Sequence, residues 1–159
     1  MKTIGNLLSR DLSKRIEEII KVDQTDEQTV YTEITEYIAT DRLVNQYREI
    51  LTAITDAHRE PHEGIGVWIS GFFGYGKSSF AKNLGYVLAN RSVLDHPAAE
   101  LFKEQVNDER IGRLIDYITA SIPTEVVMFD VSVDRAVRQT SQRIAEIMYR
   151  VLLREGDYL

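Results

Sequence analysis

The chain has 159 residues and a mass of 18.2 kDa, which is enough for about one domain with a hydrophobic core of its own. Apolar residues make up 43% and charged residues 28%, a balance that excludes long disorder, collagen-like repeats and a disulfide scaffold. A net charge of −6 argues against binding of nucleic acid by the whole surface. The lack of cysteine excludes disulfides, thiolate metal sites and cysteine catalysis.

The sequence contains no signal peptide pattern and no run of about 20 apolar residues, so we expect a cytoplasmic protein without a membrane partner. A dense turn signal at residues 59–64 coincides with a change in charge. Residues 1–63 hold 8 basic and 13 acidic side chains, whereas residues 64–159 hold 11 and 12. We therefore expect an organisational boundary between an N-terminal part, 1–63, and a second part, 64–159.

The N-terminal part is expected to be mainly helical. Residues 15–22 fit a short extended segment slightly better than a helix. Thr25 and Gln28 have the spacing of a capping box, and apolar residues follow at helical spacing as far as Ile38. A second helix is predicted over about residues 40–57. We interpret the apolar faces of both helices as core.

After the boundary the pattern changes to alternating strands and helices. Residues 66–70 are short, apolar and β-branched, which predicts a buried parallel strand with Trp68 in the core. Helices are expected over about 77–90, over 98–120 as one helix or two, and over 134–155, with a second strand at 125–131. This order predicts an α/β fold.

The segment Gly71-Phe72-Phe73-Gly74-Tyr75-Gly76-Lys77-Ser78 matches the phosphate-binding pattern G-x-x-x-x-G-K-[ST] at every fixed position. A chance match in a chain of this length is on the order of 0.5%. The glycines let backbone N–H groups approach phosphate oxygens, and the following helix adds its positive N-terminus. Lys77 is expected to reach the β- and γ-phosphates, and the Ser78 hydroxyl to hold Mg²⁺. Ser79 is a second hydroxyl beside this site.

A second Mg²⁺ ligand is harder to place. Asp130 follows four apolar residues, as the acid of a Walker B strand does, but it also fits the end of an ordinary strand. The glutamate that usually activates water is absent, because Val131 stands in its place. Asp130 is therefore an open candidate for the metal, and no catalytic residue is assigned.

Residues 66–80 resemble the P-loop of the large ATPases of BREX and Pgl phage-defence systems, the BrxC/PglY family. The resemblance extends upstream to residues 10–12, 20–24 and 36–40, and downstream to 84–88. It implies a P-loop NTPase of the additional-strand or AAA+-like type, a three-layer sandwich that binds ATP–Mg²⁺ through Lys77 and Ser78. It further implies other BREX-type components as partners, a possible homo-oligomer, and DNA contact only indirectly or through regions outside this chain. Tyr75 departs from the small residue of the family pattern, but pointing outward it should not block phosphate.

The chain is short for such a fold, because its two predicted strands do not complete a sheet of about five. We expect an N-terminal portion of a longer ATPase that lacks the hydrolytic residues by itself. Two alternatives stay open: a small self-contained kinase or NTPase that uses Asp130 as its Walker B acid, and a nucleotide-binding module that hydrolyses nothing.

Overall fold

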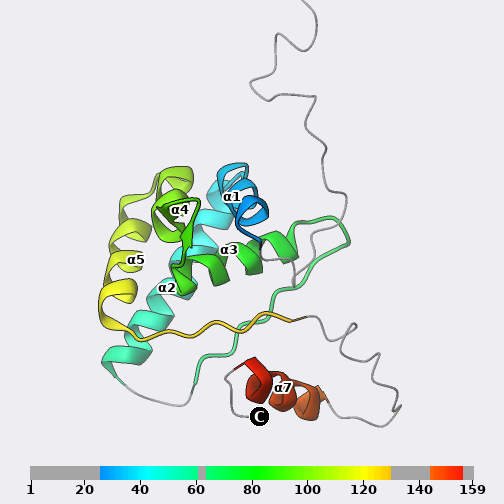
Figure 1. Ribbon diagram of the computed structural model, residues 1–159. Helices are drawn as coiled ribbons and strands as arrows, with labels where there is room; N and C mark the ends of the chain where they lie inside the picture. Colours follow the sequence, from blue (N-terminus) through cyan, green and yellow to red (C-terminus); the bar gives the residue numbers. More distant parts are fainter. Residues whose placement is uncertain (1–25, 61–63, 130–143, 156–159) are drawn as a thin grey trace, which may run out of the picture.

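The computed structural model describes residues 26–60, 64–129 and 144–155. In chain order the elements are α1 (Glu27–Thr35), α2 (Asp41–Arg59), α3 (Lys77–Ala89), β1 (Ser92–Val93), β2 (His96–Pro97), α4 (Ala98–Val106), α5 (Glu109–Ser121) and α7 (Ile144–Glu155). The two strands pair in an antiparallel sense, Ser92 opposite Pro97 and Val93 opposite His96. The described chain is therefore mostly helical (Figure 1).

The helices expected before residue 121 are confirmed, but α1 ends at Thr35, and Ile38, expected on its apolar face, is 79% exposed. The predicted helix over 98–120 is two helices, because Asn107 ends α4 in the left-handed conformation and Asp108 caps α5 by accepting from the N–H of Ile111 at 2.9 Å. Asp26 caps α1, accepting from the N–H of Thr29 at 3.0 Å. The predicted cap Thr25 and residues 15–22 lie outside the described residues, and the predicted helix 134–155 is described only as α7.

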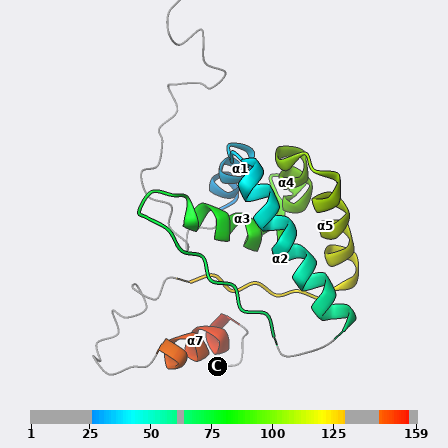
Figure 2. The ribbon, with the colours of Figure 1, turned by 180° about the vertical axis from the view of Figure 1, so that it is seen from behind.

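Helices α1 to α5 share one hydrophobic core, and Figures 1 and 2 show them gathered into a bundle from which α7 lies apart. Tyr47 of α2 lies at the centre of this core. Its ring stacks on Phe80 of α3 at a centroid distance of 4.2 Å and meets Phe102 of α4 edge to face at 5.0 Å. Its hydroxyl donates to the Phe80 carbonyl oxygen at 3.1 Å and lies 3.2 Å from the hydroxyl of Tyr37. Burial raises the pKa of the Tyr47 phenol.

Two ion pairs tie the helices together further. Glu33 of α1 accepts from Lys82 at 2.8 Å and from the hydroxyl of Tyr86 at 2.6 Å, and both donors belong to α3. Lys82 is only 1% exposed, so the pairing with this carboxylate offsets the cost of burying its side chain. Arg48 of α2 pairs with Asp108 at 2.8 Å and so joins α2 to the start of α5. Helix α3 is thus held by α1 through Glu33 and by α2 through Tyr47.

The predicted three-layer α/β P-loop sandwich is wrong for the residues that the structure describes. Residues 66–70 and 125–129, expected as parallel strands, carry no strand pairing there. The physical reason is that a strand satisfies its backbone only against a neighbouring strand, whereas a helix bonds within itself. An apolar, β-branched run therefore favours a strand, but it forms one only where a partner strand is present, and the described residues provide none.

The two segments differ in how far they are covered. Residues 126–129 are half-buried, and Met128 packs against α3, its sulfur 2.8 Å from where a Cβ at Gly85 would lie. Residues 64–70 are exposed throughout. Trp68, predicted to lie in the core, is 91% exposed. In Figure 1 the segment of residues 64–70 runs from the gap after α2 toward the start of α3, and so leads directly into the candidate site.

Candidate functional site

The loop of residues 71–76 joins the exposed segment to α3. Gly76 is the N-terminal cap of α3, with φ +75 and ψ +18, and Gly74 has φ +81. A Cβ at either position would meet nothing within 4 Å. It is therefore the left-handed backbone, rather than lack of space, that calls for glycine at these two positions.

The side chain of Lys77 folds back over this loop. Its Nζ donates to the carbonyl oxygen of Phe72 at 2.7 Å, and its Cδ lies 3.8 Å from where a Cβ at Gly71 would be. The N–H of Tyr75 donates to the same Phe72 carbonyl at 3.3 Å. The loop thus curls around the Phe72 carbonyl group, and the Lys77 amine lies beside the loop backbone.

The N-terminus of α3 opens onto this loop. Its first intrahelical bond beyond the cap runs from the N–H of Phe80 to the carbonyl of Gly76 at 2.9 Å, and no side chain caps the helix. The N–H groups of the first turn therefore lack acceptors within the helix and add to its positive end. Such groups bind an anion without help from side chains.

The two serines of the motif have different surroundings. Ser78 is exposed in the first turn of α3 next to Lys77. Ser79 is half-buried, and its carbonyl accepts from the side-chain amide of Asn83 at 2.9 Å. Ser78 is therefore the hydroxyl placed to contact a ligand at the loop. Asp130, the other metal candidate, lies outside the described residues. Within the described ranges, no three His, Asp or Glu side chains come together as a metal site.

Aromatic side chains surround the loop on its outer side. Phe72 is 78%, Phe73 94% and Tyr75 73% exposed, and the rings of Phe72 and Tyr75 meet edge to face at 5.6 Å. The Tyr75 side chain lies beside the loop, with its Cδ2 3.8 Å from where a Cβ at Gly71 would be. The structure thus places residues 71–76 in an exposed loop and residues 77–79 in the first turn of α3 that follows it.

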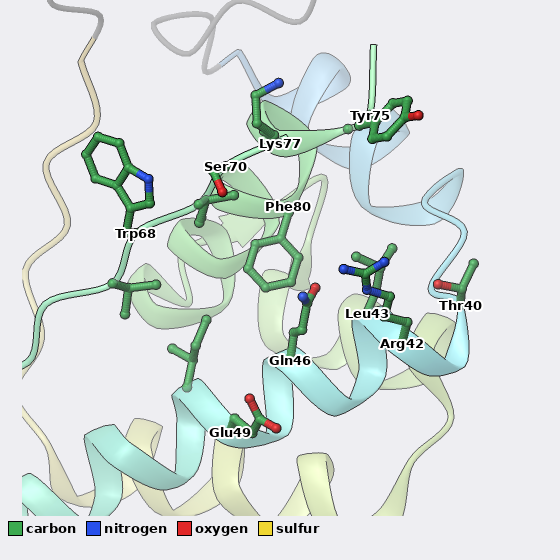
Figure 3. A pocket seen from close by; sticks show the side chains of 14 residues that line it. Thr40, Arg42, Leu43, Gln46, Glu49, Trp68, Ser70, Tyr75, Lys77 and Phe80 are labelled. Carbon is green, nitrogen blue, oxygen red and sulfur yellow. The ribbon is translucent and has the colours of Figure 1, made fainter. Parts of the chain in front are cut away.

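A cavity of about 560 Å³ lies next to this turn, between α2 and the exposed segment (Figure 3). Arg42, Gln46 and Glu49 of α2 line it opposite Trp68 and Ser70, and Lys77 lines its end. The three α2 residues share one local feature in the sequence: they are polar positions on the helix face turned away from Tyr47. Nothing local in the sequence relates them to the loop, which lies more than twenty residues later.

No protein-family model and no solved structure matches this chain. No helix in the described part of the chain is both long and apolar enough to span a lipid bilayer.

Proposed function

We propose that the chain binds the phosphates of a nucleoside triphosphate, ATP with Mg²⁺, at residues 71–78. The observation that carries this proposal is the combination of left-handed glycines, a helix start without a side-chain cap, and Lys77 folded over the loop. Each feature serves the binding of a multiply charged anion, and all three belong to one G-x-x-x-x-G-K-S segment.

The roles of the residues follow from their positions. Backbone N–H groups at the start of α3 donate to phosphate oxygens, and the helix dipole adds favourable charge. Lys77 exchanges its hydrogen bond with the Phe72 carbonyl for a stronger, charge-assisted bond to phosphate. The Ser78 hydroxyl is the group of this loop that would hold Mg²⁺, which would offset the negative charge of the phosphates.

The choice of ATP, and of a biological setting, rests on the resemblance of residues 66–80 to BREX and Pgl defence ATPases. On that basis the chain is proposed to work in the cytoplasm as the nucleotide-binding portion of such an ATPase, with other BREX-type components and further copies of itself as partners. These finer assignments depend on phosphate binding at the loop, so that binding is the first point to test.

The test is calorimetric titration of the chain with ATP–Mg²⁺, alongside Lys77→Ala. A hydrogen bond to a charged group contributes about 1.5–3 kcal/mol, so the variant should bind roughly 10- to 100-fold more weakly. Arg113→Ala is the control, because it removes one positive charge from an exposed side chain of α5 whose ion pair among the described residues is with exposed Glu109, at 3.4 Å. Equal affinity of the wild type and Lys77→Ala would disprove the proposal.

A further inference from the structure

The cavity beside the loop has the size of a small-molecule site. Its volume of about 560 Å³ falls within the roughly 300–1,000 Å³ common for ligand pockets. Tyr75, Gly76 and Lys77 line it and also belong to the loop proposed to bind phosphate. A ligand with its phosphates at the loop would therefore have the cavity within reach of its remaining part.

The walls of the cavity combine apolar surface with a few polar groups. Leu43 and Ile50 of α2, together with Phe80 of α3, supply apolar surface. Figure 3 shows Arg42, Gln46 and Glu49 directed from α2 toward the exposed segment and the start of α3. Apolar walls with a small number of polar groups are typical of sites for small-molecule ligands.

Trp68 and Tyr75 stand at the border of this cavity with most of their surface open to water. At 91% exposure, the indole of Trp68 leaves a large apolar area in contact with solvent. Aromatic rings held in this way stack readily on a nucleobase, because every base has an apolar face. The two rings thus add stacking surface to the polar groups of α2.

We propose that this cavity holds the nucleoside part of the nucleotide, so that α2 and the segment before the loop select the ligand. The inference rests on the proposed function of the loop. Trp68 or Tyr75 covers a face of the base. Gln46 can donate to and accept from the edge of an adenine at the same time. Glu49 is suited to accept from ribose hydroxyls.

The chain offers a direct probe, since Trp68 is its only tryptophan. Its fluorescence therefore reports on this cavity alone. The full chain is titrated with ATP–Mg²⁺ and, in parallel, with inorganic tripolyphosphate and Mg²⁺, which carries the phosphates without a nucleoside. We expect both ligands to bind in a manner that depends on Lys77, ATP more tightly, and only ATP to change the emission of Trp68.

A variant of α2 distinguishes the contribution of the cavity to ATP binding from that of the loop. Gln46→Ala should weaken ATP binding by roughly 2- to 10-fold and leave tripolyphosphate binding unchanged, as expected for loss of one or two neutral hydrogen bonds. Gln28→Ala makes the same change on α1, outside the cavity, and should alter neither. Far-ultraviolet circular dichroism checks that each variant is folded.

The outcomes distinguish the two proposals. Loss of affinity for ATP alone in Gln46→Ala supports the nucleoside cavity. An equal effect on both ligands, or none, overturns the cavity and leaves the phosphate loop standing. If the wild-type chain binds neither ATP nor tripolyphosphate, the loop and the cavity are both wrong.

Discussion

The helical bundle and the segment of residues 64–76 contain similar apolar side chains in opposite surroundings. In the bundle, Tyr47, Phe102 and Ile111 are fully buried. In the segment, Trp68 and Phe73 are more than 90% exposed. The bundle covers its apolar faces because amphipathic helices pack against one another, whereas the segment has no neighbouring strand among the described residues. The bundle thus supplies the buried contacts that stabilise the fold, and the exposed segment supplies the surface proposed to contact a ligand.

The two regions nevertheless meet at α3. Phe80, three residues after Lys77, stacks on Tyr47 at the centre of the core. Lys82 and Tyr86, two and six residues after Phe80, bind the Glu33 carboxylate. The start of α3 is therefore fixed by the bundle, while the loop that precedes it remains exposed. A rigid helix start with an open loop is a suitable arrangement for binding an anion by backbone groups.

The sharpest test of this contrast compares two phenylalanines. Phe102 is fully buried, so Phe102→Ala should destabilise the chain by about 3–5 kcal/mol, through lost burial and the cavity that it leaves. Phe73 is 94% exposed, and Phe73→Ala should change stability by less than about 0.5 kcal/mol. Urea unfolding followed by circular dichroism measures both. A large loss of stability for Phe73→Ala would show that the loop aromatics are buried in solution.

A smaller effect is expected at the junction of the two regions. Gly76→Ala places a Cβ on a left-handed residue, which costs about 1–2 kcal/mol. The strain should also pull the start of α3 out of place and weaken ATP binding. Gly66→Ala is the matched control, because a Cβ there meets nothing within 4 Å and Gly66 is not among the glycines with positive φ. If the two variants have equal stability and equal ATP affinity, the left-handed cap is not needed.

The sequence predicted the helices of the bundle, though not the bundle itself, because the signals for a helix are local. The spacing of Ile111, Ile115 and Ile118 marks one face of α5 without any knowledge of what covers it, and all three are buried. The segment 66–70 has an equally clear apolar pattern, but a strand depends on partners elsewhere in the chain. That dependence explains why the α/β sandwich was predicted and is not found in the described residues.

The candidate site also contains residues that a local pattern predicts and residues whose place depends on tertiary packing. The glycines, Lys77 and Ser78 are predictable because one short pattern contains the whole loop. Gln46 and Glu49 are not, because their place beside the loop depends on Tyr47 of α2 stacking against Phe80 of α3. A contact between side chains 33 residues apart leaves no local trace in the sequence.

The smallest expected effect concerns the joint between α2 and α5. The hydrogen bond from the N–H of Ile111, followed by the bond from Arg48, lowers the pKa of Asp108. A carboxylate with a lowered pKa stabilises the fold above its unfolded pKa of about 3.9, and that contribution is lost as the pH falls through the folded value. Asp108→Asn keeps a capping side chain but removes the charge. It should cost less than about 1 kcal/mol at pH 7, since Arg48 and Asp108 are both partly exposed.

This difference between the wild type and Asp108→Asn should shrink as the pH falls below about 4, because the wild-type carboxyl then becomes neutral as well. Urea unfolding of both proteins from pH 7 down to pH 2.5 measures it. Glu104→Gln, which neutralises an exposed carboxylate of α4, serves as the control for a general effect of net charge. A difference that stays constant over this range would mean that the cap acts through its geometry alone, and that the charge of Asp108 adds nothing to the packing of α5 on α2.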